Sequence, residues 1–95
     1  MRTMARVTIP VEAGNKGIKN GSLPKVMQTI GERWKPEAMY FTTFDGQRTA
    51  FIIFDLPDAS SIPVIAEPLF MELNAAVVFA PVMNNDDLQK GLAQV

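Results

Sequence analysis

The dipeptide Asp45-Gly46 constrains the fold of this chain more than any other feature. A two-residue hairpin loop of type I′ needs positive φ at both central positions, and Asp-Gly is one of the pairs that adopt it readily. Aromatic and β-branched residues, which favour strands, fill the segments on both sides of the dipeptide. The sequence therefore predicts an antiparallel β-hairpin over residues 39–56.

The register of this hairpin follows from its loop. If Asp45 and Gly46 form the loop, Phe44 pairs with Gln47, and directly opposite residues share a face of the sheet. One face is then wholly apolar and consists of Met39, Phe41, Ala50, Ile52, Phe54 and Leu56. The other is mixed and consists of Ala38, Tyr40, Thr42, Thr49, Phe51, Ile53 and Asp55. A sheet with one solvated face alternates cleanly between apolar and polar residues. The large apolar side chains of the mixed face therefore indicate that it is covered too.

Two elements and a weaker segment are expected before the hairpin. Residues 5–9 alternate as a strand, which Pro10 ends. Residues 12–19 predict a short helix or turn, weakened by two glycines. Ser22 is the expected N-cap of a longer helix, and Pro36 predicts that this helix ends just before it. The apolar stripe of the longer helix is Leu23, Val26, Met27, Ile30 and Trp34.

A second long helix is expected after the hairpin, capped by Asp58 or by a following serine. Its apolar stripe is Ile62, Ile65, Ala66, Leu69, Phe70 and Leu73. Pro68 lies in mid-helix and removes a hydrogen bond, which predicts a kink and a Val64 carbonyl without its usual donor. A pocket beside Pro68, with Glu67 and Glu72 near it, is one interpretation, and a simple bend with solvated glutamates is the other.

The last segment predicts a strand and a short helix. Residues 75–82 are apolar on both faces, which is typical of a strand covered on both sides. In the tail, Asn84 or Asn85 is the expected helix cap, and Leu88 and Leu92 lie one turn apart.

The predicted order β-α-β-β-α-β, followed by a small helix, is the ferredoxin-like pattern with strand order 4-1-3-2. We expect one α+β domain over residues 1–95 with a four-stranded antiparallel sheet. Two helices can cover only one face of such a sheet. The other face holds Tyr40, Phe51 and Ile53 beside Arg6, so we expect a homodimer that packs sheet against sheet.

Composition excludes several classes of chemistry. The chain has no cysteine and no histidine, which removes disulfides, zinc sites of the usual kind and Ser-His triads. We expect no metal and no cofactor. The net charge of −1 argues against nucleic acid or an anionic membrane as a partner. Neither a membrane-spanning run nor a signal-peptide core is present, so we expect a cytoplasmic protein.

Four runs, VTIPVEAGN, GSLPKV, KPEAMYFTTFDGQRTAFIIFDL and IAEPLFMELNAAVVFAPVMN, resemble small bacterial proteins in a domain-of-unknown-function family of the dimeric α/β-barrel superfamily. The resemblance implies a ferredoxin-like subunit whose sheet packs on that of its partner, with the helices outside. It implies no activity. Better-known members of the superfamily include monooxygenases, dehydratases and isomerases that act on small ring compounds. Several of these use histidine, which this chain lacks, and a shared fold specifies no reaction.

The candidates for catalysis are Tyr40, Asp55 and Arg6 on the mixed face. In a functional interpretation Asp55 accepts a proton, Tyr40 donates a hydrogen bond and Arg6 holds an anion. In a structural interpretation Arg6 pairs with Asp55, and Tyr40 hydrogen-bonds across the dimer. The sequence contains no catalytic motif that decides between them, so whether the protein is an enzyme stays open.

The leading hypothesis is a homodimer that binds a small, largely apolar molecule in a cleft between helices and sheet, with or without weak enzymatic activity. Its expected ligand-binding residues are Met27, Trp34, Met39, Phe41, Phe54 and Phe70, and Ile30 and Leu69 complete the walls. The alternative is an interaction or dimerisation module without a ligand, which predicts a filled core. Single-stranded RNA binding is favoured least: residues 50–54 match the end of an RNA-recognition pattern, but the positions before them do not.

Overall fold

A computed structural model of the chain describes residues 1–95. It contains four strands, four helices and one short 3-10 helix. Their order is β1 (Arg2–Ile9), α1 (Val11–Asn20), α2 (Ser22–Trp34), β2 (Ala38–Phe44), β3 (Gln47–Asp55), η1 (Ala59–Ser61), α3 (Ile62–Leu73), β4 (Ala76–Pro81) and α4 (Asn85–Leu92). The expected α+β class with a four-stranded antiparallel sheet is confirmed.

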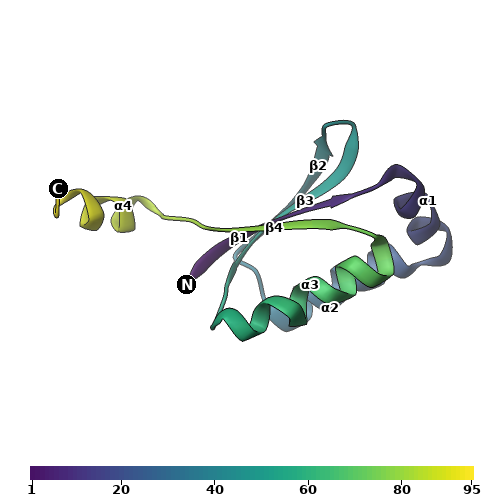
Figure 1. The fold of residues 1–95 in the computed structure, drawn as a ribbon, viewed down its shortest axis with the longest axis horizontal. Coiled ribbons are helices and arrows are strands. Elements are labelled where there is room, and N and C mark those ends of the chain that lie inside the picture. Colours follow the sequence, from purple (N-terminus) through teal and green to yellow (C-terminus); the bar gives the residue numbers. More distant parts are fainter.

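The strands form an open sheet in the order β2-β3-β1-β4, which is 4-1-3-2 counted from the other edge. The hairpin has the predicted loop: Asp45 and Gly46 both have positive φ, 52° and 73°. Phe44 pairs with Gln47 and Tyr40 with Phe51, so the predicted register is confirmed. The tip of this hairpin bends to the side of the sheet away from α2 and α3 (Figure 1).

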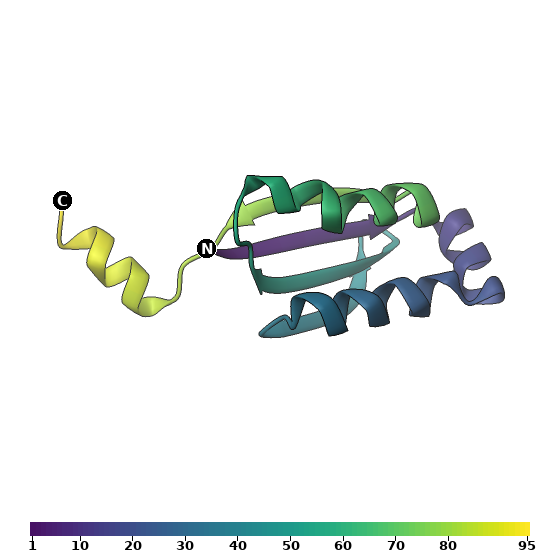
Figure 2. The same ribbon diagram turned by 90° about the horizontal axis from the view of Figure 1, so that it is seen from below.

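Helices α2 and α3 lie side by side over one face of the sheet (Figures 1 and 2). Between helices and sheet lies a core of 13 buried side chains, among which Ile52, Phe54 and Leu69 are at most 1% exposed. The ring of Phe54 packs edge-on against Trp34 and Phe79, with centroid distances of 5.8 and 6.4 Å. This core fills most of the space between helices and sheet, and a hollow of about 220 Å³ beside Met27 and Phe41 remains where α1 and α2 face the hairpin.

Helix α1 is longer than the sequence indicates because its glycines are packing positions. A Cβ on Gly14 would lie 2.5 Å from Nη1 of Arg48, and one on Gly17 would lie 3.0 Å from Cβ of Leu23. Both glycines are buried. The low helix propensity of glycine, about 1 kcal/mol below alanine in a helix interior, is offset here by the close approach that it permits.

The predicted N-cap of α2 is wrong. Gly21, in the left-handed conformation, occupies the cap position, and Ser22 is the first helical residue. The Ser22 N–H is satisfied instead by Oδ1 of Asn20, at 2.9 Å. The short link between α1 and α2 requires positive φ at residue 21, which glycine adopts without strain.

Before α3, Asp58 caps the 3-10 turn η1 by accepting a hydrogen bond from the Ser60 N–H at 2.8 Å. The Ser60 hydroxyl also donates to this carboxylate. These bonds lower the pKa of Asp58, with the hydroxyl contact as the largest cause. Helix α3 then runs without interruption through Pro68.

The chain ends in an arm that extends from the body beyond the start of β1 (Figures 1 and 2). The Val82 N–H donates to the Arg2 carbonyl at 3.1 Å, which prolongs the β4 ladder by one bond before α4. Asn84, one of the two residues predicted as the cap, is the N-cap of α4. None of the helices has the length and apolar character needed to cross a membrane.

Candidate functional site

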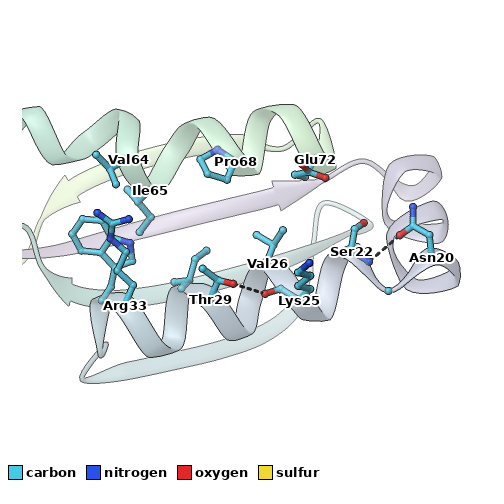
Figure 3. A pocket seen from close by; sticks show the side chains of 13 residues that line it. Asn20, Ser22, Lys25, Val26, Thr29, Arg33, Val64, Ile65, Pro68 and Glu72 are labelled. Carbon is cyan, nitrogen blue, oxygen red and sulfur yellow. Dashed lines mark hydrogen bonds between the residues drawn. The ribbon is translucent and has the colours of Figure 1, made fainter.

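A groove of about 610 Å³ lies between α2 and α3, on the outer side of the helix layer (Figure 3). Its lining comes from the two helices and from the link before α2. The lining residues are Asn20, Gly21, Ser22, Lys25, Val26, Thr29, Ile30, Arg33, Trp34, Val64, Ile65, Pro68 and Glu72. A volume of this size is in the range of small-molecule sites.

The walls of the groove follow from helical periodicity. On α2, residues 22, 26, 30 and 34 repeat every four positions and form one wall, and residues 25, 29 and 33 form the neighbouring row. On α3, Val64, Ile65 and Pro68 point toward α2 (Figure 3). Ile30 and Ile65 are buried and connect the groove to the core.

Pro68 shapes the groove chemically as well as sterically. Because proline has no N–H, the Val64 carbonyl lacks its usual donor one turn later in the helix. Val64 and Pro68 both line the groove, so the turn of α3 that lacks this hydrogen bond lies at this surface. Of the two glutamates considered beside Pro68, Glu72 lines the groove and Glu67 does not.

The rim of the groove is charged and mixed in sign. Lys25 and Arg33 come from α2, and Glu72 comes from α3. The Arg33 guanidinium lies over the Trp34 ring at 5.6 Å, an arrangement that holds the cation at the end of the groove. The Thr29 hydroxyl donates to the Lys25 carbonyl at 3.0 Å. The groove thus combines an apolar floor with two cations on one wall.

Few of the expected ligand-binding residues reach this groove. Trp34 lines it, as does Ile30 from the expected walls. Met27, Phe54 and Leu69 belong to the closed core, and Met39 is half-buried beside it. Phe41 and Phe70 are 61% and 41% exposed. The structure therefore does not bring the expected six together around one cleft.

The three candidate catalytic residues also lie apart. Asp55 pairs with the Met1 ammonium at 2.6 Å, at the end of β3. Arg6, in the middle of β1, lies over the Phe44 ring at 5.1 Å. Tyr40 is 70% exposed on the edge strand β2. The expected Arg6–Asp55 pair is wrong, because the β1–β3 register places Arg2 opposite Asp55 and Arg6 opposite Phe51.

A second surface of interest is the sheet face that no helix covers, here called the open face. Its pairs across β1 and β3 include Met4 with Ile53 and Arg6 with Phe51. The Phe51 ring packs edge-on against Phe44 at 6.3 Å. Val78 of β4, opposite Arg6, is 49% exposed. The open face is thus largely apolar, with Arg6 in its middle and Arg2 at its end.

Most of the residues that line the groove were not predicted, although the sequence contains a signal for them. Lys25, Thr29 and Arg33 repeat at four-residue spacing beside the apolar stripe of α2, which places two cations along one edge of a helix. What the sequence does not give is the separation of the two helices, which depends on side chains from both.

No cluster of three carboxylates that would hold a metal ion is present. In comparisons with known proteins, no family model and no curated protein matches this chain.

Proposed function

We propose that the chain is a ferredoxin-like subunit of the dimeric α/β-barrel kind, and that it forms a homodimer with the open faces of two copies in contact. The observation that supports the dimer is the apolar character of the open face. Tyr40 is 70% and Val78 49% exposed there in the single chain. Exposed apolar patches of this kind mark interaction sites.

The energetics favour covering the open face. Burial of a large apolar side chain contributes about 1.5–3 kcal/mol, and the open face presents several, including Phe44, Phe51 and Ile53. A second copy supplies the same surface, so that an isologous contact covers both faces at once. We also propose a cytoplasmic location. Disulfides are rare in the cytoplasm, and a chain without cysteine forms none.

We propose that each subunit binds a small molecule with an apolar body and an acidic group in the groove between α2 and α3. The apolar body would lie on Val26, Ile65 and Pro68. Lys25 and Arg33 would attract the acid, and Glu72 at the opposite wall would favour a donor on the same ligand. The groove has about 610 Å³, whereas the hollow between helices and sheet has about 220 Å³, so we prefer the groove as the ligand site.

A second candidate function is a dimerisation or protein-interaction module without a ligand. The packed core favours it, since 13 side chains are buried between helices and sheet and the hollow that remains there, beside Met27 and Phe41, has only about 220 Å³. The two candidates differ in one respect that can be measured, which is whether the α2–α3 groove binds a small anionic probe.

Trp34 allows a direct test, because it is the only tryptophan of the chain and lies in the groove. We expect anilinonaphthalene sulfonate, an apolar anion, to bind saturably and to accept excitation energy from Trp34. Val64→Glu places a like charge in the groove and should weaken binding about tenfold, equivalent to 1.4 kcal/mol. Met71→Glu is the matched control, since Met71 lies on the same helix, is 72% exposed and does not line the groove.

Saturable energy transfer that Val64→Glu weakens and Met71→Glu leaves unchanged supports the ligand site. If the probe gives no saturable transfer, or if both variants bind it equally well, the ligand site is refuted and the interaction module is favoured.

A further inference from the structure

Helix α4 has no partner within its own chain. All its residues are exposed, and its two leucines, Leu88 and Leu92, are 41% and 53% exposed. No other helix or strand packs against it, and it lies well apart from the body (Figure 2). One ion pair, between Arg2 and Asp87 at 3.3 Å, ties it to β1.

The helix is nevertheless well defined at its start. Asn84 Oδ1 accepts from the Asp87 N–H at 2.8 Å, and Asp87 Oδ2 accepts from the Asn84 N–H at 3.1 Å, a complete capping box. An isolated helix of eight residues is too short to be stable in water. A capped helix of this length with two leucines on one side is therefore typical of a segment that packs on another surface.

The arm is directed away from its own open face. The Val82–Arg2 hydrogen bond and the Arg2–Asp87 ion pair hold its base in line with the strands, and α4 lies beyond the end of the sheet in both views (Figures 1 and 2). The hairpin tip lies toward the opposite end and bends to the side of the open face (Figure 1). A second copy that packs on the open face would therefore also meet the hairpin, whose tip bends toward it (Figure 1).

Charge decides how the second copy is oriented. A two-fold axis in the plane between the two sheets brings the arm of one copy over either the arm or the hairpin of the other. When the arm lies over the other arm, Asp86 of one copy comes near Asp86 of the other, and like charges in one interface are unfavourable. When the arm lies over the hairpin, Asp86 comes to the side of Arg6. Neither of these two residues makes an ion pair in the single chain, whereas Asp87 pairs with Arg2.

We propose that α4 packs on the hairpin of a second copy of this chain, with Leu88 and Leu92 against Tyr40 and Phe44. These two aromatic side chains are 70% and 41% exposed and share the open face through the β2–β3 register. The arm-to-hairpin contact rests on the proposed homodimer and adds a second, outer contact on each side of its two-fold axis.

The first test compares dimer dissociation constants by sedimentation at several concentrations. The double variant Leu88→Asp/Leu92→Asp should dissociate about 100-fold more readily than the wild type, as expected for loss of buried anchors in an interface. Lys90→Gln is the control, because Lys90 lies on the other side of α4 and its loss makes the chain more negative, as each leucine replacement does. A double variant that dimerises as tightly as the wild type would refute the arm-to-hairpin contact.

The second test uses the absence of native cysteine. In Leu88→Cys/Phe44→Cys, oxidation should give a covalent dimer whose peptide map links position 88 to position 44 of the other copy. Lys90→Cys/Phe44→Cys should link much less. A link of 88 to 88 would show arm over arm and refute the proposed orientation. A monomeric wild type would refute the homodimer itself, whereas a dimer without the 88–44 link would refute only the arm contact.

Discussion

Tyr40 lies directly opposite Phe51 in the β2–β3 ladder, and both side chains belong to the open face. Directly opposite side chains in an antiparallel pair are close enough to form one apolar surface. Phe51 also contacts Phe44 edge-on. The pair therefore forms the centre of an aromatic patch that a single chain leaves open.

Two glycines of the helical region should respond in opposite directions to alanine. Gly17→Ala places a methyl group 3.0 Å from Cβ of Leu23 and 3.1 Å from Cδ2 of Leu73, and such overpacking costs about 1–3 kcal/mol. Gly31→Ala meets no atom within 4 Å and should stabilise by up to about 1 kcal/mol through helix propensity. Urea unfolding of both variants measures the two changes, and a Gly17→Ala protein as stable as Gly31→Ala would contradict the packing of α1.

Leu69 is the side chain through which α3 closes the core. It is 0% exposed, so Leu69→Ala should lower the free energy of unfolding by about 2–5 kcal/mol. Met71→Ala, two residues along and 72% exposed, should change it by no more than about 0.5 kcal/mol. The measurement is urea unfolding at one fixed protein concentration, because dimerisation makes stability depend on concentration. Equal losses in the two variants would contradict the orientation of α3.

Asp58 should contribute stability that depends on pH. Its pKa is lowered by the Ser60 hydroxyl and backbone bonds, so the folded state prefers the carboxylate. That contribution is complete above the ordinary carboxyl pKa of about 4 and is lost as the pH falls through the lowered pKa. Asp58→Asn keeps an acceptor but not the charge. It should unfold at lower temperature than the wild type at pH 7, and the difference should disappear in acid. If the difference in unfolding temperature between the wild type and Asp58→Asn were the same at pH 7 and in acid, the charge of Asp58 would not be its cause.

The hairpin was predictable in detail from the sequence because its chemistry is local. The loop is decided by two residues that tolerate positive φ, and each pairing follows by counting outward from it. Asn84 as the cap of α4 was predictable for the same reason, since a cap acts on the turn beside it.

Other features depend on distances between elements, which periodicity does not specify. Phe41 and Phe70 follow apolar patterns, yet they are 61% and 41% exposed, because Phe41 lies on the edge strand β2 and Phe70 is outside the buried side of α3. The α1 glycines read as helix breakers, although they admit Arg48 and Leu23 at close range. The groove likewise arises from the spacing of α2 and α3, and no single segment encodes that spacing.

If the open faces of two copies form a homodimer, sedimentation at micromolar concentration should detect the dimer in the wild type. The wild type should sediment at twice the 10.5 kDa mass of the chain. Phe51→Asp should shift it to monomer, as should Tyr40→Asp, whose exposed side chain is not needed for the fold of one subunit. Met71→Asp on the helix layer should remain a dimer. A wild-type monomer, or a dimer that both open-face substitutions leave intact, would contradict the account.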